Sequence, residues 1–239
     1  MGKLSIKIAF TEDEYLEFYN IYTDAFKNEP DEIFSKEEVL KWIDETEDYA
    51  NTKIFLLLKD NITVGFAILM HKDGIGNIPW AGIKSQYQGH GLYSQFINLM
   101  IDTIFNELNI NILTRECDNP EVLEGNVKKF AIKRLSMFRE KLNSKFYNNN
   151  EFVYFREDPK SPNERTYKYL FGFTLLKPNS NWEITNNKVS KKDFKKLVQY
   201  RIFFERGIFE IEKQLQSNPV VKDLYQEIDN LKEEYLTIE

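Results

Sequence analysis

Apolar positions along the first half of the chain follow two different spacings. Short runs that alternate every second residue predict strands, whereas longer runs with three- and four-residue steps predict helices. The predicted elements are, in order, a strand at 4–10, helices at 12–27 and 36–50, strands at 53–60, 62–72 and 77–84, a helix at 92–108 and a strand at 110–117. Thr11 with Glu14, and Ser35 with Glu38, have the spacing of capping boxes at the starts of the first two helices.

Two residues predict where the strands turn or become irregular. Only Asn61 separates the runs 53–60 and 62–72, which predicts a hairpin. Pro79 predicts that the strand 77–84 is interrupted or bulged, because proline cannot donate a ladder hydrogen bond.

The second half of the chain adds a helix, an aromatic-rich region and a helical tail. A long amphipathic helix is predicted at about 127–142, and the best strand candidates after it are 152–157 and 167–176. The tail from Ser190 predicts two helices that break at 217–219. Together the elements predict a mixed α/β layered fold with helices on both faces of a sheet. We expect a first domain at 1–180 and a C-terminal helical extension at 181–239.

An apolar stripe runs along the last predicted helix with alternating three- and four-residue steps. Its members are Val221, Leu224, Ile228, Leu231 and Tyr235. A face that closes over the protein's own sheet is the commoner use of such a stripe. A homodimer seam or another partner-binding face is the alternative.

Composition and charge restrict the class of protein and its partners. With 239 residues, 42% apolar and 15% aromatic, the chain is long enough for a large folded domain. Its formal charge is −6, and Lys and Arg are spread among Asp and Glu, which disfavours a nucleic-acid groove. The sequence contains no apolar run typical of a secretion signal and none of the roughly 18 residues that a membrane span needs. We therefore expect a cytoplasmic protein that binds neither nucleic acid nor membrane.

Cys117 is the single cysteine of the chain. An intrachain disulfide and a zinc site built on paired thiolates are therefore excluded, and no metal site is expected. A buried thiol is the commoner identity of such a residue. A nucleophile is the alternative, although no Cys–His pattern supports it.

A glycine-containing loop, KSQYQGHGLY (84–93), connects the strand that ends at Ile83 to the helix at 92–108. Successive main-chain N–H groups in such a turn, with the first N–H groups of the helix, form a concave site suited to phosphate. Glycine lets an anion approach the main chain without a Cβ atom in the way. A Gly-x-Gly turn before a helix is often only a connection, and neither the Rossmann nor the P-loop signature is present.

The stretch resembles the acyl-CoA-binding motif of the GCN5-related N-acetyltransferases (GNAT), an (Arg/Gln)-x-x-Gly-x-(Gly/Ala) loop that begins five residues after the end of a strand. With Ile83 at the strand end, Gln88 takes the Arg/Gln position and Gly91 the first glycine. Tyr93 stands where the family has a small residue. A second register begins at Gln86 but lies two residues closer to the strand, and we prefer the first.

The resemblance covers about residues 4–178, and it implies a GNAT-like mixed, mostly antiparallel sheet with acetyl-CoA as the cosubstrate. The pyrophosphate is expected on the main-chain amides of Gln88, Gly89, His90, Gly91, Leu92 and Tyr93. The pantetheine arm is expected to pair like an added strand with Trp80, Ala81, Gly82 and Ile83. In this family an amine attacks the thioester directly, and a main-chain N–H stabilises the developing oxyanion.

Candidate proton-transfer groups lie on three segments. Direct transfer needs a base for the ammonium proton and often uses an acid for the leaving thiolate. The strand 77–84 carries no acidic residue, so Glu116 is the first candidate base and Glu29 the second; a solvated carboxylate is the alternative for each. The family's tyrosine acid is replaced by Arg139. Tyr147 is the candidate substitute, with a core or surface aromatic as its alternative.

The resemblance implies an acetyl-CoA-dependent N-acetyltransferase that acts on a primary amine of a small molecule or a peptide. The alternative is a non-catalytic acyl-CoA-binding regulatory module that acts through its helical tail, suggested by the missing strand glutamate and by Arg139. The aromatic-rich segment after residue 143 suits an apolar acceptor, but it equally suits a sheet packed on the tail helices.

Overall fold

The computed structural model describes residues 2–27, 33–41, 50–147, 152–158, 161–177, 182–185, 187–206 and 210–239. The chain divides into two compact units, Met1–Ile110 and Asn111–Glu239. This boundary differs from the expected one at residue 180. The helices of the tail share one apolar core with strands of the preceding segment, and a domain boundary at residue 180 stays a prediction.

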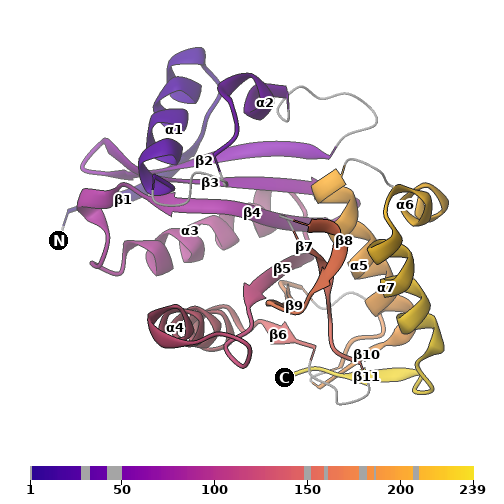
Figure 1. The fold of residues 1–239 in the computed structure, drawn as a ribbon. Coiled ribbons are helices and arrows are strands. Elements are labelled where there is room, and N and C mark those ends of the chain that lie inside the picture. The colour runs from indigo at the N-terminus through magenta and orange to yellow at the C-terminus, as the bar shows by residue number, and fades with distance from the viewer. Residues whose placement is uncertain are drawn as a thin grey trace. The chain divides into compact units, whose positions relative to one another are not determined.

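The first unit contains a four-stranded antiparallel sheet with helices on both faces (Figure 1). Its strands, in spatial order, are β1 (Leu4–Ile8), β2 (Asn51–Lys59), β3 (Ile62–Lys72) and β4 (Ile75–Ile83). Its helices are α1 (Glu12–Ala25), α2 (Lys36–Lys41) and α3 (Leu92–Glu107). α1 packs on β3 and β4 through Phe18 and Tyr22, whose rings meet Phe66 edge-on.

Local sequence signals set the ends of several of these elements. The capping boxes of Thr11–Glu14 and Ser35–Glu38 are both formed, as predicted. The β2–β3 hairpin turns at Asp60 and Asn61, which both adopt positive φ angles, the conformation of the turn favoured between antiparallel strands. The helix predicted at 36–50 is helical over Lys36–Lys41, and its remainder at 42–49 lies outside the described residues.

The predicted irregularity in the strand around Pro79 is confirmed. The pairing of β3 with β4 shifts register between Ile68 and Met70, which face Trp80 and Asn77. One extra residue on β4 is therefore accommodated at the proline, where a ladder hydrogen bond cannot form.

The second unit is built on a smaller antiparallel sheet. β9 (Tyr169–Leu175) lies between β5 (Ile112–Asp118) and β6 (Lys145–Phe146). Two further pairs are β7 (Arg156–Asp158) with β8 (Ser161–Thr166), and β10 (Lys188–Ser190) with β11 (Tyr235–Thr237). The helices are α4 (Gly125–Leu142), α5 (Lys191–Arg206), α6 (Ile211–Ser217) and α7 (Pro219–Asn230).

Helices α4 and α5 cover opposite faces of β5. Arg115 lies over the ring of Phe138 in α4, whereas the next residue, Glu116, pairs with Arg201 in α5. Consecutive strand residues point to opposite faces, so the two contacts assign one helix to each. The strand predicted at 152–157 is regular only from Arg156; the preceding residues Tyr154 and Phe155 are buried without forming a strand.

The apolar stripe of the tail packs inside its own unit. Val221, Leu224, Ile228 and Leu231 are buried in one core with aromatic residues of β9 and α5. Tyr235 departs from the prediction, since it lies in β11 and is 42% exposed. The break between the tail helices is confirmed, because Asn218 ends α6 and caps α7 with its side chain. The stripe is thus used within the unit, which removes the basis for a homodimer seam on these helices.

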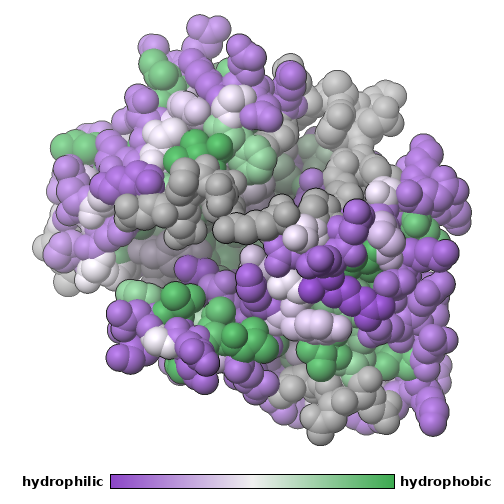
Figure 2. Space-filling view, viewed as in Figure 1, coloured by the Kyte–Doolittle hydropathy of each residue, from purple (hydrophilic) through white to green (hydrophobic). Residues whose placement is uncertain are grey.

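Helix α4 concentrates positive charge, contrary to the even spread of Lys and Arg expected from the sequence. Its sequence, GNVKKFAIKRLSMFREKL, contains six Lys or Arg residues and one Glu, so the basic residues are not evenly spread. Val127, Phe130 and Ile132 on the same helix are exposed, and Figure 2 shows hydrophobic surface over α4. Among the described residues, no helix has the length and apolar character that a membrane span requires.

Candidate functional site

The loop between β4 and α3 has the backbone conformation that its glycines predict. A 3₁₀ turn at Ser85–Tyr87 leads to Gln88, and Gly89 and Gly91 then adopt φ angles of 80° and 72°. Gly91 is the N-cap of α3. A Cβ atom at either glycine would meet no heavy atom within 4 Å. The glycines are therefore required by the turn and by the open surface above it, and not by close packing beneath it.

Side chains of the first unit hold this loop in place. The carboxylate of Asp24, at the end of α1, accepts the main-chain N–H of Ser85 at 2.7 Å. This hydrogen bond is the main cause that lowers the pKa of Asp24 below its ordinary value. At the other side of the turn, Nε2 of Gln88 donates to the carbonyl of Ile83 at 2.9 Å. The contact links the strand end to the loop, and the register that begins at Gln88 stays a prediction.

The start of α3 is open to an anion. The first N–H groups of a helix have no intrahelical acceptor, and the helix dipole adds positive potential there. Gly91 supplies no capping side chain. Residues 88–91 are exposed, Leu92 is buried and Tyr93 is half-buried. The N–H of Gln88 donates to the carbonyl of Ser85 at 3.3 Å. The predicted contact residues therefore form one surface loop that ends at a helix N-terminus.

β4 presents alternate main-chain groups away from β3. The N–H of Lys84 donates to the carbonyl of Val64 on β3 at 2.8 Å. Main-chain groups of a strand alternate in direction, so the N–H groups of Ala81 and Ile83 point away from β3. Gly82 has a packing role, because a Cβ atom there would lie 2.8 Å from both Ala25 and Phe66.

Trp80 is also predicted to pair with the pantetheine arm. It is half-buried and meets the ring of Phe34 edge-on, with centroids 5.5 Å apart. Phe34 precedes α2, so the tryptophan side chain packs on the α1–α2 connection. Its contribution to a pantetheine site would therefore come from the main chain.

Glu116 lies in a buried cluster of charged residues of the second unit. Its Oε2 accepts Nη1 of Arg156 at 2.8 Å and Nη2 of Arg201 at 2.7 Å, and its Oε1 accepts the hydroxyl of Tyr154 at 2.5 Å. Burial raises the pKa of Glu116, but the charges of Arg201 and Arg156 outweigh burial and hold the pKa below its ordinary value. A carboxylate in this environment is a weak base, and we do not assign it to proton transfer.

The other two candidates for proton transfer have different outcomes. Tyr147 is buried in the core of the second unit, with ring centroids 5.3 Å from Phe152 and 4.9 Å from Phe194. This is the core alternative, and we do not assign Tyr147 as an acid. Glu29 lies outside the described residues, so its candidacy stays a prediction.

Cys117 takes the less reactive of its two alternatives, and Arg139 contacts an aromatic ring. Burial raises the pKa of the Cys117 thiol to about 11, so the thiol stays protonated and is a poor nucleophile. Arg139 is exposed and lies over the ring of Phe146, 5.9 Å from its centroid. Among the described residues, no three His, Cys, Asp or Glu side chains gather as metal ligands.

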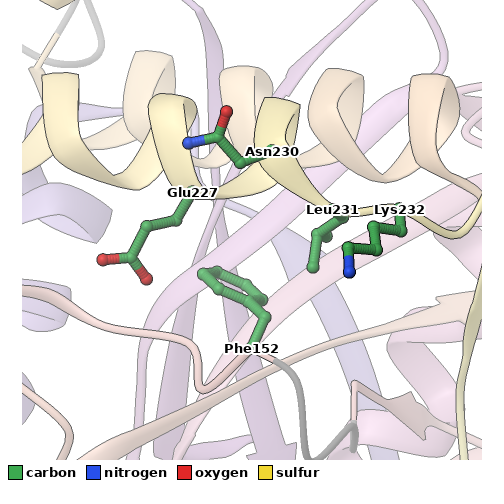
Figure 3. A pocket seen from close by; sticks show the side chains of 5 residues that line it. All are labelled: Phe152, Glu227, Asn230, Leu231 and Lys232. Carbon is green, nitrogen blue, oxygen red and sulfur yellow. The ribbon is translucent and has the colours of Figure 1, made fainter.

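A pocket lies in the second unit at the C-terminal end of α7 (Figure 3). Its lining residues are Phe152, Glu227, Asn230, Leu231 and Lys232. Phe152 and Leu231 belong to the apolar core, and Glu227 is paired with Arg165 at 2.6 Å. None of the predicted site residues lines this pocket, and we do not include it in the site.

Solved structures with similar folds identify the arrangement of elements. A protein from Bacteroides thetaiotaomicron assigned to the GNAT family of acetyltransferases matches with a TM-score of 0.60 and 13% identity, over 85% of this chain and 99% of that one. A chimera of the spermidine N-acetyltransferase SpeG from Vibrio cholerae and hSSAT matches with a TM-score of 0.50 and 14% identity, over 72% of this chain and 95% of that one.

The chain has the GNAT fold. No protein-family model and no curated protein matches its sequence. The strand, glycine loop and helix that carry the resemblance in sequence are present in the expected order within this GNAT fold. The similarity therefore confirms the expected fold class.

Proposed function

We propose that the protein is an acetyl-CoA-dependent N-acetyltransferase that acts on a primary amine. The observation that carries the proposal is the exposed loop at 88–91, with positive φ angles at both glycines, followed directly by a helix that has no side-chain cap, in a GNAT fold. Main-chain N–H groups in this arrangement suit a pyrophosphate. The N–H groups of Ala81 and Ile83 are suited to pair with the amide-containing pantetheine arm.

The proposed chemistry is direct attack of the neutral amine on the thioester carbonyl. A main-chain N–H of β4 would stabilise the oxyanion, and the tetrahedral intermediate would then expel CoA as a thiolate. A thiol has an ordinary pKa of about 8.5, so the thiolate can leave near neutral pH without a side-chain acid. Glu29 is the proposed base, since Glu116 is held by two arginines.

Release of the CoA thiol with a panel of amines tests this function. The panel contains spermidine, which the name of one similar structure specifies, a peptide with a free N-terminus and a lysine-containing peptide. Release that depends on both amine and enzyme, with acetylated product confirmed by mass spectrometry, supports the proposal. Glu29→Gln should lower kcat with little change in KM for the active amine, because it removes a proton acceptor and no binding group.

A non-catalytic acyl-CoA-binding module is the second candidate. It is favoured by the environments of Glu116 and Tyr147, neither of which is arranged for proton transfer. It is weakened by the burial of the tail stripe, through which such a module was expected to act. Binding of acetyl-CoA without turnover on any amine of the panel would favour this candidate.

We further propose a cytoplasmic location, with which a single buried thiol is compatible.

A further inference from the structure

The charged cluster around Glu116 has a second side that faces a different carboxylate. Glu116 receives one nitrogen from each of Arg156 and Arg201. The remaining terminal nitrogens, Nη2 of Arg156 and Nη1 of Arg201, both donate to Glu205. They reach separate oxygens, Oε1 and Oε2, so one carboxylate spans two guanidinium groups. Hydrogen bonds between ionised groups of this kind are shorter and stronger than those between neutral groups.

The two sides of the cluster differ in how firmly they are held. Glu116 is fixed on β5, and all its hydrogen bonds come from Tyr154, Arg156 and Arg201 as described above. The side chains of Glu116 and Arg201 are 12% and 7% exposed, whereas that of Glu205 is 29% exposed. The cluster therefore has a buried, rigid side at Glu116 and a side that opens to solvent at Glu205.

Glu205 has the attributes of an internal ligand. It follows Arg201 by four residues on α5, so it reaches the arginines along the helix surface. If its side chain rotated away, Glu116 would still hold Arg156 and Arg201. Nη2 of Arg156 and Nη1 of Arg201 would then lose Glu205 as their acceptor. Leaving such donors unpaired is costly, so another acceptor of the same shape would be favoured in its place. Glu157, whose charge also acts on Arg201, lies on β7.

We propose that Arg156 and Arg201 form a binding site for a carboxylate, and that Glu205 occupies this site in the structure as an intramolecular stand-in. The ligand class is an organic carboxylate, from a small molecule or from the C-terminus of a peptide. The site lies within the second unit and does not depend on the proposed acetyl transfer.

The test uses Glu205→Ala, which removes the carboxylate that Arg156 and Arg201 hold, and acetate as the probe. Acetate should raise the Tm of this variant saturably by about 2–4 °C, with acetamide and equal ionic strength of chloride giving no rise. Wild-type protein should respond at least about tenfold more weakly, because Glu205 competes at high effective concentration. Glu233→Ala, which removes an exposed carboxylate elsewhere in the unit, is the matched control and should behave as wild type.

Two further experiments test whether acetate binds at Arg156 and which class of carboxylate the site admits. The double variant Glu205→Ala, Arg156→Lys keeps the charge but loses the planar fork, and its acetate response should disappear. Acetyl-Gly-Gly, compared with its C-terminal amide, distinguishes a site that admits a chain terminus from one restricted to small carboxylates. Glu205→Gln keeps the side-chain volume and serves if Glu205→Ala does not fold.

A folded Glu205 variant that shows no saturable acetate response would overturn the proposal. An equal response to chloride would also overturn it, because simple charge screening would then explain the effect. Failure of both variants to fold would show that Glu205 is required for the folded structure. It would equally contradict the proposal that an external carboxylate can displace Glu205.

Discussion

Nε2 of Gln88 donates a hydrogen bond to the main-chain carbonyl of Ile83 at 2.9 Å, and this contact joins the end of β4 to the loop that follows it. Gln88 thereby fixes the path of the main chain just before Gly89 and Gly91 turn toward α3. A polar side chain that spans five residues in this way orients N–H groups without itself contacting a ligand. The identity of the residue at this position therefore matters for the shape of the loop.

Gln88→Ala should weaken acetyl-CoA binding by about 2- to 10-fold, because a neutral hydrogen bond contributes about 0.5–1.5 kcal/mol. Gln86→Ala, in the same loop, is the matched control, and it also tests the alternative register in which Gln86 takes the motif position. Calorimetric titration of both variants measures the difference. Loss of affinity in Gln86→Ala alone would show that the register beginning at Gln88 is wrong.

Gly91→Glu should abolish measurable acetyl-CoA binding while the protein stays folded. The substitution places a carboxylate at an anion site and a Cβ atom at a φ of 72°, where only glycine is unstrained. Gly125→Glu makes the same change at another open position with positive φ, the first residue of α4. Circular dichroism checks folding of both. Equal loss of binding in the two variants would mean that backbone strain, and not the loop, is responsible.

The capping box of α1 predicts a specific loss of stability in acid. Hydrogen bonds from the main-chain N–H of Phe10, from Lys7 and from the N–H of Thr11 lower the pKa of Glu14 to about 2. Because the folded pKa lies below the ordinary value, Glu14 stabilises the protein above about pH 4.5, and this contribution is lost as the pH falls toward 2. Urea unfolding should show Glu14→Gln less stable by about 1 kcal/mol at pH 7, with the difference vanishing near pH 2.

Glu12→Gln is the control for this prediction, since it removes a charge from the same first turn without removing the capping hydrogen bonds. A deficit of Glu14→Gln that stays constant from pH 7 to pH 2 would contradict the assignment of the stabilisation to the ionised carboxylate.

Glu116→Gln should act mainly on stability. Removing one partner of a buried ion pair leaves uncompensated arginine charge and costs about 3–5 kcal/mol. Asp118→Asn, on the same strand but in a pair with the half-exposed Arg134, should cost less than about 1 kcal/mol. Chemical denaturation compares the two. A Glu116→Gln protein of normal stability whose kcat alone is lost would instead support Glu116 as a catalytic base.

The features that sequence predicted best depend on residues close together along the chain. Thr11 and Glu14 are three residues apart, and the turn at Asn61 and the bulge near Pro79 follow from the backbone preferences of single residues. The glycine loop belongs to the same class, because its conformation is determined within a few positions.

The features that sequence missed depend on distant partners. Arg156 and Arg201 lie 40 and 85 residues from Glu116, so no local spacing indicates that they hold its carboxylate. The spacing of Val221 and Leu224 predicted packing on the protein's own sheet, but it did not indicate that the strand would be β9.

Calorimetric titration of the purified protein with acetyl-CoA, with CoA and ATP as comparison ligands, tests the central claim most directly. The loop geometry predicts micromolar binding of acetyl-CoA and CoA and much weaker binding of ATP, which lacks the pantetheine arm that would pair with β4. Binding of neither acetyl-CoA nor CoA by the folded protein would contradict the claim that Gln88–Tyr93 is an acyl-CoA site.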